Sequence, residues 1–198
     1  MLSWAPDTNH IGVYVAKNKG WFAQAGLDVN IIGVAQAGAE QAVHSGLADF
    51  ALSNMANVGA LSLKDINLTQ VLQVQQKPSA IWCALAANKE IESPKDFDGK
   101  IFATFGANED SAIVKQMIQE DGGKGDFDSV TVGTSTFQVL EANKADFGGF
   151  YDTWEGVQAA LHGPKLNCFK GEDFGVPGNP NQIGIITKNR PVSTIRNL

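Results

Sequence analysis

The sequence predicts an α/β protein built from two similar lobes, with mainly parallel sheets flanked by helices. Strand-like apolar runs alternate with helical patterns along the 198 residues, which is typical of βαβ units. Residues 45–58 and 142–156 also share one order of features: a helix end, Ala-Asp-Phe, a short apolar strand with a polar end, and a new helix. This shared order favours two similar lobes over a chance repeat of a common turn.

The first lobe begins with a polar turn over residues 4–10. A helix is expected over 11–20, and a shorter one ends near Gly26. The elements that follow are strands over 27–34, 49–54, 69–76 and 79–88 and helices over 39–48 and 55–64. Turn residues at 93–100 come next, so we expect a lobe boundary between residues 86 and 98.

The second lobe repeats the alternation of strands and helices. Its expected strands cover 100–106, 128–133, 146–152 and 166–171, and its helices cover 108–121, 136–145 and 153–163. A last strand over 182–189 is a candidate crossing back to the first lobe. Lobe one is therefore assigned to residues 1–88, lobe two to 89–184, and the return crossing to 185–198.

Composition and motifs exclude several classes of function. The net charge of −6 and the lack of a Lys/Arg run argue against a nucleic-acid partner. No stretch approaches the roughly 20 apolar residues of a membrane span, so none is expected. Metal-ligand spacing, a nucleophile elbow, a dinucleotide fingerprint and a phosphate loop are all missing. We expect no metal, no cofactor and no catalytic residue.

The two cysteines, Cys83 and Cys168, lie far apart in the sequence and in apolar surroundings. They have neither the CxxC spacing nor the neighbouring histidines of a zinc site. Two buried free thiols are favoured over a disulfide.

A ligand site is expected where the strands end. In open α/β sheets the binding crevice lies beyond the carboxyl ends of the strands, and four such ends combine flat aromatic rings with hydrogen-bonding groups. That combination suits a planar, nitrogen-containing small molecule. The candidate ligand-binding residues are Trp4, Asn9, His10, Asn54, Trp82, Phe105, Glu109, Asp110, Tyr151 and Trp154.

Several of these residues also have a purely structural interpretation. Glu109 and Asp110 would stabilise the first turn of a helix without any ligand. His10 can be an ordinary first-turn residue next to a capping Asp7 or Thr8. Trp82, in an apolar strand, can pack in the core. These alternatives stay open at the level of sequence.

The opening run WAPDTNHIGVYVAKNKGWFAQAGLDV, residues 4–29, closely resembles the start of the NMT1/THI5-like family, in particular thiamine-pyrimidine substrate-binding proteins of ABC importers. The resemblance continues through SGLADFALS, SPKDFDGK, FGANED and FYDTWEG and covers nearly the whole chain. It implies a two-lobed type II periplasmic-binding fold with two crossings between the lobes and a cleft that closes on its ligand. A membrane permease would receive the loaded form.

The resemblance implies a thiamine-precursor pyrimidine, with a hydroxymethyl or formylamino group, as ligand. The implied contacts are Trp4, Asn9, His10, Phe105, Asp110, Tyr151 and Trp154. Relatives often have Trp-Gly-Ser-Pro-Ser-Glu where this chain has residues 105–110, and a shorter FYGW where it has FYDTW. The resemblance also implies an extracytoplasmic location, allows a lipid anchor in a full-length precursor, and indicates a C-terminal truncation that removes the rest of lobe one.

An alternative within the same superfamily is a pyrimidine synthase that uses pyridoxal phosphate. The resemblance implies a cofactor lysine and a histidine in such enzymes where this chain has Ser53 and Asn57. Serine cannot form a Schiff base, which argues against this function. A binder of riboflavin or of another nitrogen heterocycle is a further alternative. An alkylsulfonate is disfavoured because no arginine precedes Arg190.

Overall fold

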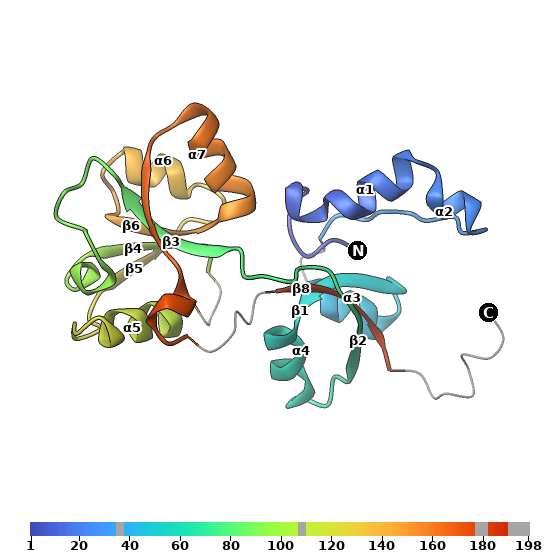
Figure 1. The fold of residues 1–198 in the computed structure, drawn as a ribbon. Helices are drawn as coiled ribbons and strands as arrows, with labels where there is room; N and C mark the ends of the chain where they lie inside the picture. The colour runs from blue at the N-terminus through green and yellow to red at the C-terminus, as the bar shows by residue number, and fades with distance from the viewer. Residues whose placement is uncertain (35–37, 107–109, 177–181, 190–198) are drawn as a thin grey trace. The chain divides into compact units, whose positions relative to one another are not determined.

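The structure, a computed structural model, describes residues 1–34, 38–106, 110–176 and 182–189 (Figure 1). The chain divides into two compact units. Unit 1 comprises Met1–Pro78 and Pro180–Leu198, and unit 2 comprises Ser79–Asn179. Each unit has its own sheet and its own apolar cores.

Unit 1 contains a three-stranded sheet in the order β1-β8-β2. Its elements are η1 (Thr8–His10), α1 (Ile11–Asn18), α2 (Trp21–Gln24), α3 (Ala39–Ser45), β1 (Phe50–Asn54), α4 (Met55–Ser62), β2 (Leu68–Gln73) and β8 (Ile183–Lys188). The central strand β8 runs antiparallel to both neighbours. The strands β1 and β2 are therefore joined by a strand that lies more than 100 residues later in the chain.

Helices pack on both faces of this sheet because successive side chains of a strand point to opposite faces. On one face Ala51 and Ile186 pack with residues of α3 and α4. On the other, Leu52 and Ile183 pack with Leu2, and α1 contributes partly buried side chains. Ile186 is fully buried at the centre of the sheet.

The strand predicted over residues 27–34 was wrong. These residues form no strand, although the backbone N–H of Leu2 donates to the carbonyl oxygen of Ile32 at 2.9 Å. The Leu52 N–H donates in turn to the Met1 carbonyl oxygen, also at 2.9 Å. The opening residues thus lie beside β1, but isolated hydrogen bonds do not make a ladder.

Unit 2 contains a five-stranded sheet in the order β5-β4-β6-β3-β7. Its elements are β3 (Ala80–Leu85), η2 (Pro94–Phe97), β4 (Ile101–Thr104), α5 (Asp110–Glu120), β5 (Asp128–Thr131), α6 (Thr136–Glu141), β6 (Phe147–Tyr151), η3 (Asp152–Gly156), α7 (Val157–His162), β7 (Leu166–Phe169) and η4 (Gly171–Phe174). Strand β4 is parallel to β5 and β6, and β3 is antiparallel to β6 and β7. The α/β class is as expected, but the sheets are not mainly parallel: the sheet of unit 1 is antiparallel and the sheet of unit 2 is mixed.

The sheet of unit 2 lies between α5 on one side and α6 with α7 on the other (Figure 1). Phe102 and Phe147 pack against the apolar side of α5. Ile81 and Phe150, which point the other way, pack against α6 and α7. Both faces are covered, which explains why the central strands are almost continuously apolar.

The division between the units differs from the expected boundaries at residues 88 and 184. Residues 80–85 form β3, which pairs with β6 and β7 and therefore belongs to unit 2. Ile183 and Gly184 already pair with β1 in unit 1. Sequence patterns locate strands well, but the partners of a strand decide its unit.

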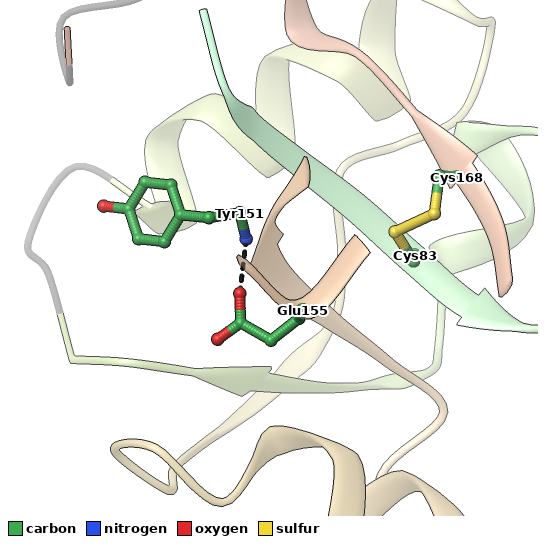
Figure 2. The surroundings of a disulfide bond; sticks show 4 residues. All are labelled: Cys83, Tyr151, Glu155 and Cys168. Atoms are coloured by element: carbon green, nitrogen blue, oxygen red, sulfur yellow. Dashed lines mark hydrogen bonds between the residues drawn. A yellow bond between two sulfur atoms is a disulfide. The ribbon is translucent and has the colours of Figure 1, made fainter. Parts of the chain in front are cut away.

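The expectation of two free thiols was also wrong, because Cys83 and Cys168 form a disulfide (Figure 2). The two residues lie directly opposite each other on the antiparallel strands β3 and β7, with 4.1 Å between their Cα atoms. Cys83 is fully buried on the side of α6 and α7. Because the two cysteines have a sequence separation of 85, local sequence patterns could not indicate that the register of the sheet pairs them.

This disulfide should contribute strongly to the stability of unit 2. We expect the double variant Cys83→Ala/Cys168→Ala to lower the free energy of unfolding by about 2–4 kcal/mol, because the crosslink restricts the unfolded chain. Guanidinium unfolding followed by tryptophan fluorescence measures the change. Reduced wild-type protein should unfold at the midpoint of the double variant, and equal midpoints for oxidised wild type and variant would contradict the expectation.

Candidate ligand-binding site

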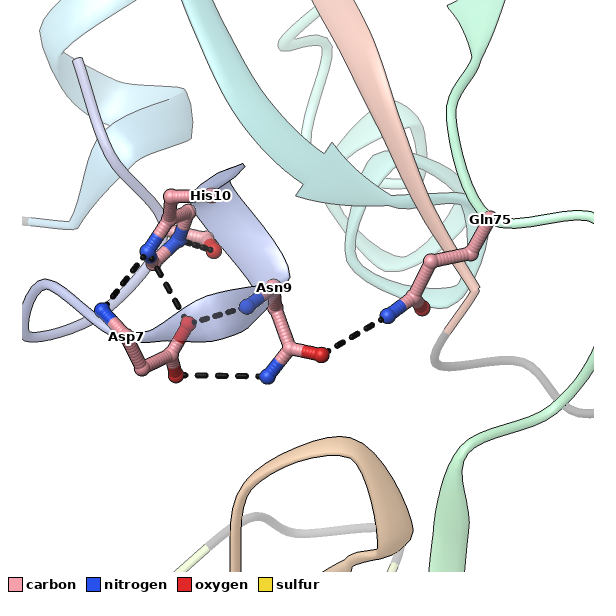
Figure 3. Close-up of polar contacts among 5 residues, drawn as sticks. Asp7, Asn9, His10 and Gln75 are labelled. Carbon is pink, nitrogen blue, oxygen red and sulfur yellow. Dashed lines mark hydrogen bonds and ion pairs between the residues drawn. The ribbon is translucent and has the colours of Figure 1, made fainter. Parts of the chain in front are cut away.

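The opening turn of unit 1 is closed by a reciprocal cap at Asp7 (Figure 3). The Asp7 carboxylate accepts a hydrogen bond from the backbone N–H of Asn9 at 2.8 Å. The backbone N–H of Asp7 donates to Nδ1 of His10 at 3.3 Å. These contacts satisfy backbone groups that a short helix would otherwise leave unpaired. The capping interpretation of Asp7 is therefore confirmed.

His10 lies inside this turn and is only 2% exposed. Its Nδ1 lies 3.1 Å from Oδ1 of Asp7, and its Nε2 lies 3.2 Å from Oγ of Ser3. Both ring nitrogens thus have partners within the opening segment. The buried His10 side chain thus stabilises the turn. Direct contact between His10 and a ligand stays a prediction.

The charge of Asp7 is stabilised within the turn. Burial opposes its ionisation, but the close approach of the His10 ring and the hydrogen bonds from Asn9 outweigh burial and hold the pKa of Asp7 below its ordinary value. The ionised carboxylate is the form that caps the turn.

Asn9 connects the opening turn to Gln75, which lies just after β2 (Figure 3). Its Nδ2 donates to Oδ2 of Asp7 at 3.3 Å, and its Oδ1 accepts from Nε2 of Gln75 at 3.1 Å. Trp4, on the same opening segment, has 41% of its surface exposed. This segment therefore combines an oriented carboxamide with an accessible aromatic ring.

Asn54 ends β1 and caps α4, because its Oδ1 accepts from the backbone N–H of Asn57 at 2.8 Å. The adjacent hydroxyl of Ser53 donates to Oε1 of Glu40, and Nδ2 of Asn57 donates to the same oxygen at 3.0 Å. At the two positions where the resemblance implies a lysine and a histidine in pyrimidine synthases, this chain thus has two neutral side chains that donate to one carboxylate.

Phe105 and Tyr151, two of the candidate residues of unit 2, lie where β4 and β6 end. The rings of Phe105 and Tyr151 stack, with centroids 5.9 Å apart and planes inclined by 21°. Gly149 lies beside this pair, and a Cβ atom there would come within 3.6 Å of the Phe105 ring. Because β4 and β6 are parallel neighbours, their ends bring the two rings to the same edge of the sheet.

Asp110 begins α5 and is only 6% exposed. Its Oδ2 accepts a hydrogen bond from Oγ1 of Thr104 at 2.8 Å. The Thr104 hydroxyl oxygen also accepts from the backbone N–H of Gly106 at 2.9 Å, which connects the end of β4 to the start of α5. The buried carboxyl group of Asp110 thus contacts Thr104, the residue directly before Phe105 of the aromatic pair.

The segment after β6 is a π-helical turn, Asp152–Gly156, that continues into α7. The backbone N–H of Tyr151 donates to Oε2 of Glu155 at 2.8 Å, which fixes the start of this turn (Figure 2). Trp154 is 42% exposed. Such turns interrupt regular helices and are frequent at functional sites.

Trp82 is 3% exposed and packs in the α5-side core of unit 2. Its indole Nε1 is buried and has no hydrogen-bond partner among the described residues. The structure thus fits the core interpretation of Trp82, and a ligand contact through it stays a prediction. Glu109 lies outside the described residues.

The described candidate residues are divided between the two units. Trp4, Asn9, His10 and Asn54 belong to unit 1, and Trp82, Phe105, Asp110, Tyr151 and Trp154 belong to unit 2. Sequence reasoning missed Gln75, which donates to Asn9, and Glu40, which accepts from Ser53 and Asn57. Neither has a local signal, because each acts through residues distant in sequence.

Two negative findings apply to the described ranges. No group of three or more His, Cys, Asp or Glu side chains within them could hold a metal ion. Among the same residues, no helix has the length and apolar character that crossing a bilayer requires.

The depressed pKa of Asp7 predicts a contribution to acid sensitivity. Below about pH 4, the unfolded chain takes up a proton at this carboxyl before the folded protein does, so the stability from ionised Asp7 falls as the pH drops. We expect Asp7→Asn to show a weaker loss of thermal stability than wild type across this range. The same substitution at exposed Asp28 should leave the pH profile of the melting temperature unchanged, and a parallel profile for Asp7→Asn would contradict the expectation.

The chain matches a known protein family and a named relative. The family described as "NMT1/THI5 like" matches residues 7–197. A formylaminopyrimidine-binding protein of Halalkalibacterium halodurans is 30% identical over 182 residues, which cover 89% of this chain and 54% of that protein. The chain thus spans about half the length of this relative.

Solved structures support the fold. The alkanesulfonate-binding protein SsuA of Xanthomonas axonopodis pv. citri, bound to MOPS, matches with a TM-score of 0.70 at 14% identity, over 98% of this chain and 66% of that one. The periplasmic aliphatic sulphonate binding protein SsuA of Escherichia coli matches with a TM-score of 0.68 at 15% identity, over 90% and 58%. At these identities the likeness concerns the fold alone. The chain belongs to the NMT1/THI5-like family.

Proposed function

We propose that this protein is a solute-binding protein of an ABC-type importer, and that its ligand is a thiamine-precursor aminopyrimidine with a hydroxymethyl or formylamino group. The family and the 30% identity to a formylaminopyrimidine-binding protein support this proposal. The implied partner is an ABC permease.

The observation that carries the proposal is the stacked pair of Phe105 and Tyr151 near the buried Asp110. A pyrimidine is flat and offers its faces to aromatic rings, while its exocyclic amine donates hydrogen bonds. The bond from Thr104 orients the Asp110 carboxyl group, whose oxygens can accept a hydrogen bond from such an amine. In unit 1, Asn9 and Trp4 offer the same two kinds of contact.

Binding without chemical conversion fits the residues better than a synthase does. Ser53 and Asn57 both donate to Glu40, and Ser53 offers no amine for a pyridoxal phosphate Schiff base. The proposal therefore assigns no catalytic role to any residue.

The disulfide supports an extracytoplasmic location. Structural disulfides persist in oxidising compartments and are rare in the cytosol. The Cys83–Cys168 bond thus agrees with a binding protein that works outside the cytoplasmic membrane.

Isothermal titration with the two aminopyrimidines, thiamine and riboflavin tests the proposed ligand. We expect saturable heat with an aminopyrimidine, and loss of about tenfold or more in affinity for Tyr151→Ala, because stacking on a base contributes about 1–3 kcal/mol. Tyr151→Phe, which keeps the ring, should bind nearly as wild type does. Trp21→Ala, at an exposed ring on α2, is the control and should bind normally. If riboflavin is the only compound that gives saturable heat, the ligand is a flavin and the pyrimidine proposal is wrong.

Pyridoxal phosphate tests the enzyme alternative. After unbound pyridoxal phosphate is removed by gel filtration, we expect the protein to show no absorbance band at about 400 nm that borohydride removes, because Ser53 occupies the position of the cofactor lysine. Ser53→Lys is the informative comparison, since it restores an amine at this position. A reducible band in the wild-type protein would favour the synthase.

A further inference from the structure

Gln75, just after β2, holds both the main chain and a candidate ligand residue (Figure 3). Its Oε1 accepts from the backbone N–H of Ile183 at 3.0 Å, and its own backbone N–H donates to the Ile183 carbonyl oxygen at 2.9 Å. Its Nε2 donates to Oδ1 of Asn9 at 3.1 Å. The Gln75 carboxamide is therefore fixed at its oxygen and presents its nitrogen to Asn9.

This arrangement allows Asn9 only one orientation. The Asn9 oxygen accepts from Gln75, and its nitrogen donates to the Asp7 carboxylate. A flipped carboxamide would bring nitrogen against nitrogen at Gln75 and oxygen against oxygen at Asp7. Both hydrogen bonds would then be lost and replaced by repulsion.

Gln75 also lies close to the segment by which the chain leaves unit 1 and to the segment by which it returns. Gln75 lies three residues before Pro78, the last residue of the first segment of unit 1. Ile183 begins β8, with which the chain returns to unit 1. The Val74 N–H also donates to the Ile183 carbonyl oxygen, at 3.0 Å, so the outgoing and returning segments are joined where Gln75 contacts Asn9.

We propose that Gln75 is a positioning residue for ligand binding. It fixes the Asn9 carboxamide in the orientation that the ligand meets, and it anchors that carboxamide to the joined outgoing and returning segments. This inference rests on the proposed function, in which Asn9 contacts an aminopyrimidine. Because an amide oxygen and an amide nitrogen select opposite partners, the orientation of Asn9 decides which edge of a heterocycle it accepts.

The test compares Gln75→Glu with Gln76→Glu. Both variants add one negative charge at neighbouring positions, but Gln76 is exposed and its Nε2 donates to the backbone oxygen of Gln73 rather than to Asn9. Glu at position 75 can still accept from Ile183 but can no longer donate to Asn9. We expect titration with formylaminopyrimidine to give about tenfold weaker binding for Gln75→Glu, and binding within about twofold of wild type for Gln76→Glu. Equal affinities for the two variants would overturn the inference.

A measurement without ligand separates this inference from the proposed function. In Gln75→Leu the Ile183 amide loses its acceptor, so we expect its hydrogen exchange to quicken about tenfold or more relative to wild type and to Gln76→Leu. Unchanged exchange would refute the anchoring role of Gln75 whatever the ligand. If the wild-type protein binds no pyrimidine while Gln75→Leu still quickens the exchange of the Ile183 amide, the proposed ligand is wrong but the anchoring role of Gln75 is supported. Equal melting temperatures show that the variants fold.

Discussion

The insertion of β8 between β1 and β2 is the constraint on which unit 1 depends. Both outer strands of its sheet pair with this strand, and Ile186 at its centre is fully buried. β1 and β2 precede unit 2 in the chain, whereas β8 follows it. Unit 1 can therefore complete its sheet only after unit 2 has been synthesised. Such long-range pairing is slow, since the intervening loop must close before the contacts form.

The two groups of candidate residues are held by different physical means. In unit 1, hydrogen bonds between side chains orient the polar residues, and the ionised Asp7 organises the turn around them. In unit 2, the aromatic pair stacks at the end of two parallel strands, and the Thr104 hydroxyl donates to the buried Asp110. The first group can choose between donors and acceptors of a ligand, while the second offers a flat surface and one carboxyl group.

The sequence was sufficient to predict most of the elements of this fold. Short apolar runs between turn residues located β1, β3, β4 and β6, because burial on two faces requires such runs. Residues 27–34 show the same pattern but form no strand, since the pattern does not reveal whether a ladder partner exists. The directions of the strands and the units to which they belong also depend on distant partners.

The candidate site was predictable to a similar extent. The rule that ligands meet strand ends indicated Phe105, Asp110 and Tyr151, which the structure does bring to one edge of the sheet. It could not reveal that His10 is buried, because a first-turn histidine can point inward or outward. It could not indicate Gln75 either, because the importance of that side chain arises from Ile183, far along the chain.

The disulfide has a topological consequence for unit 2. β3 is the first strand of this unit along the chain and β7 is the last, so the bond between Cys83 and Cys168 closes a covalent ring. That ring contains the helices α5, α6 and α7 and the strands β4, β5 and β6. A protease that cuts once within the ring cannot release a fragment. The nicked molecule would keep its mass until a reductant opened the ring, so unit 2 can tolerate a broken backbone without coming apart.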